Sequence, residues 1–388
     1  MDRAHLYEER ITRISKAIKR EKPDRVPIVL KMYSWVIQYY GYSMEEFYIS
    51  NPDTAVEMYT RAADEFGFDG IYNVNNVTPL IATNELGGGV YVLGSEGIQV
   101  SNLSAHIMKP DEYSAIAEDF TGYLRDNILP RRFKKLSTGD SEAAFQALKS
   151  AYEKFVGYMG RAIKGHGEIE KAGCPVMWGQ GVLMNPLDYI MDYLRDFSGI
   201  ITDLRRQPEL VFEAANAMQK HFMENVFSKF KSFDDGHGVF WPMHLAPYLK
   251  PKDFEKFYYP YLKETLEYCI ANKIYASLLL EGNWEPYFDI LQDLPDNDYL
   301  IGSMEKGDYR TFKEKLGKKM AICGGIPLNM LAYKSKEECV EHTKKLLDEC
   351  AGGGGFIVDT DMSMMRLNDA KPENLKAVID TVIEYGKY

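Results

Sequence analysis

One histidine and several carboxylates stand shortly after apolar runs in this sequence. His244 and Glu281 each follow such a run immediately, and Asp361 follows another within three residues. An imidazole beside a carboxylate can act as a general acid or base, and imidazole with carboxylate oxygens can also hold a zinc ion. We therefore expect His244 and Glu281 to be catalytic, and His244, Glu281 and Asp361 to be the candidate metal ligands.

Aromatic and hydrogen-bonding side chains occupy the equivalent positions after other apolar runs. Rings can pack against a flat apolar ligand, while amides and carboxylates bind its polar substituents. The expected substrate contacts are Tyr33, Trp35, Asn76, Gln180, Trp284 and Glu305.

Each of these residues also has a purely structural interpretation. His244 can cap the segment that follows it, Glu281 can form a structural salt bridge, and the aromatic residues within 32–48 can be core packing. Asp359 and Asp361 can be ordinary loop residues instead of metal ligands. Burying a carboxylate without a partner costs several kcal/mol, so Glu281 should have a cation, a metal or a shared proton nearby.

The elements that would position these residues alternate along the chain. Short apolar runs read as buried strands, and amphipathic segments between them read as helices. Ser335 and Glu338, for example, have the spacing of a capping box before a helix. The eight apolar runs are 26–30, 70–74, 175–179, 239–243, 274–280, 299–303, 320–323 and 355–358.

Eight strands, each followed by helix, predict a single (β/α)8 TIM-barrel-like domain. In such a barrel, functional side chains gather where the strands end, which is where the candidate residues stand. The 388 residues exceed a minimal barrel, so we expect one domain over 1–388 with a helical insertion between the second and third strands, at about 109–173. An open doubly wound sheet is the alternative architecture.

Composition narrows the range of partners and compartments. The 46 Lys and Arg against 57 Asp and Glu give a net charge of −11, which disfavours nucleic acid. The five cysteines form no CxxC pair, the amino terminus lacks a signal-peptide core, and no apolar run approaches a membrane span. We expect a cytoplasmic protein that binds no membrane.

Seven short segments form an ordered set that runs from the first expected strand to the last helix. They are KPDRVP at 22–27, FGFDG at 66–70, PLDY at 186–189 and on to Arg195, EGNW at 281–284, CGGIP at 323–327, GGFI at 354–357 and KPENL at 371–375. Taken together, they resemble the uroporphyrinogen decarboxylase family, which includes corrinoid-dependent methyltransferases. The resemblance implies the same TIM-barrel-like fold.

The sequence departs from two branches of that family. The decarboxylases grip an acidic tetrapyrrole with arginines after the first strand and use an aspartate after the second, whereas 31–40 holds no arginine and the second run ends in Asn75 and Asn76. The coenzyme M methyltransferases bind zinc with a His-x-Cys and a later cysteine, where this chain has Leu279, Glu281 and, near the last strand, Asp361 or Met362. Porphyrinogen decarboxylation and a thiolate zinc site are therefore disfavoured.

What remains of the resemblance implies a methyltransferase of the O-demethylase type. It would move a methyl group from a small methylated substrate, expected to be a methoxyaromatic, to a corrinoid protein. Glu281 and His244 would protonate the ether oxygen or polarise it through zinc, and Tyr33, Trp35 and Trp284 would pack the ring. Because the chain shows no DxHxxG segment, the corrinoid would come from a partner protein.

The alternative is a barrel that binds a tetrapyrrole or aromatic ligand without this chemistry, or, less favoured, a decarboxylase-like lyase. A homo-oligomer is compatible with the sequence, which does not fix the oligomeric state.

Overall fold

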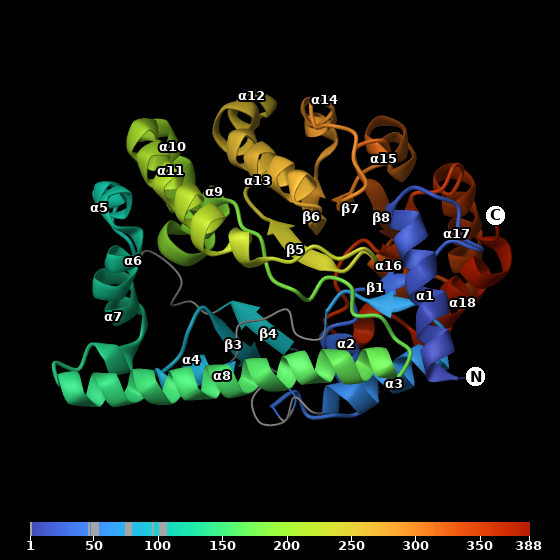
Figure 1. Cartoon of the computed structure of the whole chain (residues 1–388), viewed down its shortest axis with the longest axis horizontal. Helices are drawn as coiled ribbons and strands as arrows, with labels where there is room; N and C mark the ends of the chain where they lie inside the picture. The colour runs from blue at the N-terminus through green and yellow to red at the C-terminus, as the bar shows by residue number, and fades with distance from the viewer. Residues whose placement is uncertain (1, 46, 48–53, 74–79, 95–96, 101–106) are drawn as a thin grey trace.

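A computed structural model describes residues 2–45, 47, 54–73, 80–94, 97–100 and 107–388 of the chain. Its largest sheet is parallel, with the strand order β5-β6-β7-β8-β9 (Figure 1). Most residues of these strands are buried, as expected for a parallel sheet that is covered on both faces. The strands are β5 (Gly238–Met243), β6 (Tyr275–Asn283), β7 (Leu300–Lys306), β8 (Ala321–Ile326) and β9 (Phe356–Thr360).

Three further segments continue the sheet from β9 back to β5. The short parallel strands β1 (Val29–Leu30) and β2 (Gly70–Ile71) pair with each other, and a bridge between Ile28 and Val358 joins them to β9. On the far side of β2, the segment 175–183 bridges to Ile71 through Val176 and to Phe240 of β5 through Val182. The fold is therefore the expected TIM-barrel-like arrangement, and its eight segments coincide with the eight apolar runs.

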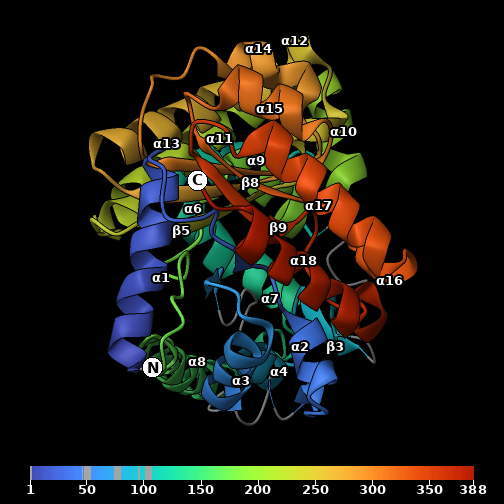
Figure 2. The same cartoon turned by 90° about the vertical axis from the view of Figure 1, so that its right-hand side faces the viewer.

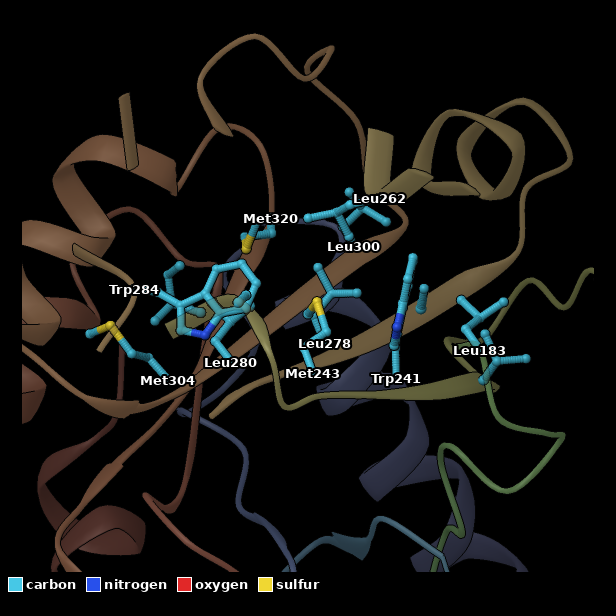
Figure 3. Close-up of a cluster of buried hydrophobic side chains, with 14 of the residues drawn as sticks. Leu183, Trp241, Met243, Leu262, Leu278, Leu280, Trp284, Leu300, Met304 and Met320 are labelled. Atoms are coloured by element: carbon cyan, nitrogen blue, oxygen red, sulfur yellow. The ribbon is translucent and has the colours of Figure 1, made fainter. Parts of the chain in front are cut away.

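Alternate residues of each strand face opposite sides of the barrel wall. Val29, Tyr72, Phe240, Leu279 and Cys323 belong to the interior cluster, which the helix α1 (Arg3–Ile18) also contacts. Their neighbours face the surrounding helices. Figure 3 shows this outer layer, in which Trp241 and Met243 of β5 lie beside Leu278 and Leu280 of β6.

Helices follow the strands and cover the outside of the barrel (Figure 2). Their start signals are local: Ser335 Oγ accepts the amide of Glu338, and the Glu338 carboxylate accepts the amide of Ser335, which confirms the capping box of α17. The covering helices are α2 (Ser34–Tyr39), α3 (Thr54–Phe66), α9 (Pro186–Tyr189), α10 (Asp196–Arg206), α11 (Pro208–Asn225), α12 (Pro251–Asp253), α13 (Tyr259–Ala271), α14 (Phe288–Leu291), α15 (Tyr309–Leu316), α16 (Leu328–Tyr333), α17 (Lys336–Cys350) and α18 (Pro372–Tyr385).

The expected insertion lies between β2 and the segment 175–183. It begins earlier than 109, because a helix and a hairpin precede that residue. Its described elements are α4 (Leu80–Glu85), the hairpin β3 (Tyr91–Gly94) and β4 (Gly97–Val100), α5 (Tyr113–Glu118), α6 (Phe120–Tyr123), α7 (Leu129–Arg132) and α8 (Ser141–Lys171). Figure 1 shows α8 stretched along one edge of the molecule. Within the described residues, no helix combines the length and apolar character of a membrane span.

Candidate functional site

Strand register brings His244 and Glu281 together. Met243 of β5 pairs with Leu280 of β6, so the residues that follow them, His244 and Glu281, stand side by side where the two strands end. The His244 Nε2 atom lies 3.3 Å from the Glu281 Oε1 atom. This is the end of the barrel at which catalytic residues of such folds gather.

A third residue, Asp192, binds the other ring nitrogen of the imidazole. The His244 Nδ1 atom lies 2.7 Å from the Asp192 Oδ2 atom. Asp192 belongs to a π-helical turn, Ile190–Arg195, that continues α9. The imidazole is therefore fixed between two carboxylates from different parts of the chain.

Asp188, one helical turn before Asp192, secures the segment that carries His244. Its two oxygens accept the Leu245 amide at 2.8 Å and the Tyr258 hydroxyl at 2.5 Å. Sequence reasoning missed both aspartates, although their four-residue spacing in PLDYIMDYLR places them on one helical face. That spacing was the available signal.

The electrostatics of this cluster keep a proton on His244. Burial alone would lower the pKa of His244, but the hydrogen bonds to Asp192 and Glu281, together with the charges of both carboxylates, raise it to about 12. Burial raises the pKa of Asp188 to about 7, although the positive charge of His244 and the two donated hydrogen bonds oppose the rise. His244 is thus an imidazolium at neutral pH, which donates hydrogen bonds and cannot serve as a base.

His244 and Glu281 open into a cavity of about 490 Å³. Its walls come from β5, β6, the α9 segment and the β3–β4 hairpin of the insertion. The described lining includes no Lys or Arg, and the residues outside the described ranges contain neither type. The lining residues are Val90, Tyr91, Val100, Met191, Asp192, Asp196, Phe197, His244, Tyr248 and Glu281.

A second ionic group lies inside the barrel. Lys31 is completely buried, and its Nζ atom bonds to the Asp359 carboxylate, to the Thr360 carbonyl oxygen at 2.8 Å and to the Ser303 hydroxyl at 3.2 Å. The ammonium also lies 4.8 Å from the centroid of the Tyr72 ring. Burial raises the pKa of Asp359, while Lys31 opposes the rise. This pair links the end of β1 to β9, its neighbour in the barrel.

The aromatic residues expected to contact substrate are mostly core residues. Trp35 and Trp284 are fully buried, and their indole N–H groups donate to backbone carbonyls: Trp35 to Ala370 at 3.0 Å and Trp284 to Glu281 at 2.9 Å. Tyr33 is 3% exposed. All three side chains are packed inside the protein, and none of them lines the cavity that holds His244 and Glu281.

The polar residues expected to contact substrate lie in different parts of the structure. Gln180 borders a cavity of about 700 Å³ near the start of β5, where its amide bonds to the Lys231 backbone. Glu305 and Asp361 line another cavity, of about 210 Å³. Asn76 lies outside the described residues.

The candidate metal ligands are therefore not brought to one point. Asp361 uses its Oδ1 atom to accept the amides of Leu328 at 2.9 Å and Met362 at 2.7 Å, in a different cavity from His244 and Glu281. In the described part of the chain, no group of three or more His, Cys, Asp or Glu side chains is arranged to hold a metal ion. His244 also has both ring nitrogens engaged by carboxylates.

Comparison with known proteins adds two findings. Residues 180–385 match the protein family described as Uroporphyrinogen decarboxylase (URO-D). Among solved structures, the chain is similar to a methyltransferase from Methanosarcina mazei, with a TM-score of 0.58 and 15% sequence identity over 97% of this chain and 98% of that chain. No curated protein sequence matches the chain.

Proposed function

The chain belongs to the uroporphyrinogen decarboxylase family, and from that premise we propose that it is a methyltransferase that moves a methyl group from a small methylated substrate to a corrinoid carried by a partner protein. The expected donor is a methoxyaromatic compound, which would make the activity an O-demethylation. The observation that carries this proposal is the imidazolium of His244, fixed between Asp192 and Glu281 in a cavity with aromatic walls.

The composition of the cavity favours this activity over decarboxylation of a porphyrinogen. A substrate with many carboxylates needs cationic partners, preferably arginines that bind carboxylates in a bidentate manner. The described cavity lining contains Asp192, Asp196 and Glu281 but neither Lys nor Arg. The similarity in fold to a protein named as a methyltransferase is consistent with the proposal.

His244 would act on the oxygen that loses the methyl group. As the carbon–oxygen bond breaks, its electron pair stays on the aromatic oxygen, and a hydrogen bond from the Nε2–H group stabilises the developing negative charge. With a pKa of about 12, His244 is a weaker acid than a phenol, whose pKa is about 10. We therefore assign it electrostatic stabilisation rather than complete proton transfer.

The other residues position the imidazolium and the ring. Asp192 holds Nδ1 at 2.7 Å, whereas the contact from Nε2 to Glu281 is longer, at 3.3 Å, so a substrate oxygen can compete with Glu281 for the Nε2 proton. Tyr91, Phe197 and Tyr248 would pack against the substrate. The reduced corrinoid would supply the nucleophile that accepts the methyl group.

Zinc does not fit this group of residues. A catalytic zinc site needs three protein ligands, whereas His244 and Glu281 supply two, and in the described part of the chain no group of three or more His, Cys, Asp or Glu is arranged to hold a metal ion. Asp361 lies in another cavity. We therefore assign no step to a metal on this protein.

Methyl transfer from a panel of methoxyaromatics to free cob(I)alamin tests the proposal, with the corrinoid absorbance as the readout. His244→Gln should lower kcat on the order of 100-fold, because a neutral amide replaces the positively charged donor to the departing oxygen. Glu281→Gln should lower the rate to a smaller extent. Asp289→Asn, which alters an exposed carboxylate on α14, is the matched control and should leave turnover unchanged.

Two outcomes would contradict the proposal. Full activity in both His244→Gln and Glu281→Gln would refute the assignment of residues. A wild-type protein that transfers no methyl group, yet is stabilised by haem, a cobamide or an aromatic compound, would support the alternative of a barrel that binds such a ligand. A ligand at a hundredfold its Kd stabilises a protein by about 2.7 kcal/mol, which a melting experiment detects.

A further inference from the structure

The long helix α8 carries a row of apolar side chains that the rest of the described chain leaves uncovered. Seven large apolar residues of this helix are between 39% and 68% exposed. Scattered exposed apolar residues are ordinary on a protein surface, but a contiguous row of them marks an interaction site. The row, here called the α8 stripe, consists of Phe145, Leu148, Tyr152, Phe155, Val156, Met159 and Ile163.

The spacing of the α8 stripe is that of a helix packed against another helix. Phe145, Tyr152 and Met159 stand seven residues apart, and Leu148 and Phe155 repeat the same interval between them. Apolar residues at alternating intervals of three and four form the seam of a helix pair. The stripe therefore has the pattern of one half of a two-helix interface.

A neighbouring face of α8 already packs within the chain. Ala151, Tyr158 and Ile169 are buried, and α8 contacts α3 and α4. Lys154 forms an ion pair with Glu85 of α4. The helix thus has two apolar faces, of which one anchors it to the molecule and the other, the α8 stripe, faces outward.

We propose that the α8 stripe is a dimer interface, in which α8 packs antiparallel against α8 of a second copy of this chain. The seven side chains expose on the order of 700 Å² of surface, taking about 150–250 Å² for a whole aromatic side chain and less for an aliphatic one. Two copies would bury about 1,400 Å² in total, which lies within the range of stable interfaces, about 1,200–2,000 Å².

Charge and symmetry favour the antiparallel orientation. Lys154 lies midway between the stripe ends Phe145 and Ile163. Glu142 precedes the stripe and Lys164 follows it, at similar distances from that midpoint. An antiparallel pair places Glu142 of each copy near Lys164 of the other, and a two-fold axis through the midpoint closes the dimer.

The place of the α8 stripe argues against the corrinoid protein as its partner. None of the seven stripe residues lines the cavity that holds His244 and Glu281 in the described structure. A corrinoid partner must reach that cavity to take the methyl group. A second copy has no such requirement, and the dimer proposal stands whether or not the proposed activity is correct.

Sedimentation velocity of the full chain between about 1 and 100 μM tests the dimer. The wild-type protein should sediment at twice the monomer mass. The variant Tyr152→Glu/Phe155→Glu should dissociate at least about 30-fold more readily, because it places charges at the centre of the interface. Tyr333→Glu, which alters a residue of α16 that is 81% exposed, is the control and should leave the dimer intact.

Disulfide cross-linking tests the orientation. The five native cysteines are buried, so an introduced cysteine would be the exposed thiol. Phe155→Cys, close to the two-fold axis, should form a covalent dimer on mild oxidation, and Phe145→Cys, at the end of the stripe, should not. A monomeric wild type, a dimer that persists in the double variant, or equal cross-linking at both positions would overturn the proposal.

Discussion

The protonation of His244 makes the sharpest prediction, and Asp192→Asn is the change that tests it. The substituted amide would keep a hydrogen-bond acceptor near Nδ1 but remove the negative charge that now lies 2.7 Å away. An opposite charge at such a distance shifts a pKa by about 1–3 units. The pKa of His244 should therefore fall from about 12 by about 1–3 units in the variant.

The same change should destabilise the folded protein in a pH-dependent way. A histidine whose folded pKa is raised stabilises the fold fully below its unfolded pKa, near 6.5, and loses that contribution as the pH rises through the folded pKa. At pH 7 the variant should therefore be less stable than wild type by about 1–4 kcal/mol, since each pKa unit corresponds to about 1.4 kcal/mol. The difference should shrink above the lowered pKa and vanish above about 12.

Nitrogen NMR of ¹⁵N-histidine-labelled protein measures the protonation state directly. The ring nitrogens of His244, assigned with His244→Gln, should keep imidazolium shifts in wild type from neutral pH to above pH ~10 and change earlier in Asp192→Asn. Asp235→Asn is the matched control: it removes a carboxylate 2.7 Å from Nδ1 of His237, whose pKa is raised to about 9 despite the opposing effect of burial. This change should lower the pKa of His237 and leave the pKa of His244 unchanged. A wild-type His244 that titrates near 6.5 would refute the reasoning.

Two further changes test buried polar groups, and one tests a helix cap. Asp188→Ala should lower the free energy of unfolding by about 2–5 kcal/mol, measured in urea, because the Tyr258 hydroxyl and a backbone amide lose their buried acceptor; Asp188→Asn should cost less. Lys31→Met should lower the free energy of unfolding by about 3–5 kcal/mol, because it leaves Asp359 without its buried partner. The double variant Lys31→Met/Asp359→Leu should recover much of that loss. Equal stability of the single and double variants would contradict this prediction. Ser335→Ala should cost about 1 kcal/mol by removing the cap of α17, and no change on melting would count against the cap.

The sequence could predict the barrel because its signals are local. Each strand of a parallel sheet is apolar on both faces, so all eight runs stand out without knowledge of the partners. The meeting of His244 with Glu281 follows from the same pattern. Both residues directly follow neighbouring strands, and neighbouring strands end at the same face.

Other parts of the site depend on distances that a linear pattern does not contain. Asp361 uses its Oδ1 atom to accept backbone amides in one cavity, whereas His244 lines another, and neither fact can be read from the order of the strands. Trp284 stands three residues beyond Glu281 but turns into the core, since its indole reaches back to the Glu281 carbonyl. Asp192 comes from the segment after α9, whose approach to β5 is a tertiary contact.

The acidity of the chain has a specific consequence at the cavity. Asp192 and Glu281 together carry two negative charges around the one positive charge of His244, and Asp196 adds another carboxylate to the lining. An anionic substrate would meet net repulsion there, whereas a neutral ether meets a donor that is already protonated. In the proposed O-demethylation, the ether oxygen would displace Glu281 from a 3.3 Å contact and then gain negative charge as the methyl group departs. The hydrogen bond from Nε2 would therefore strengthen during that reaction, and interactions that strengthen in the transition state are those that accelerate a reaction.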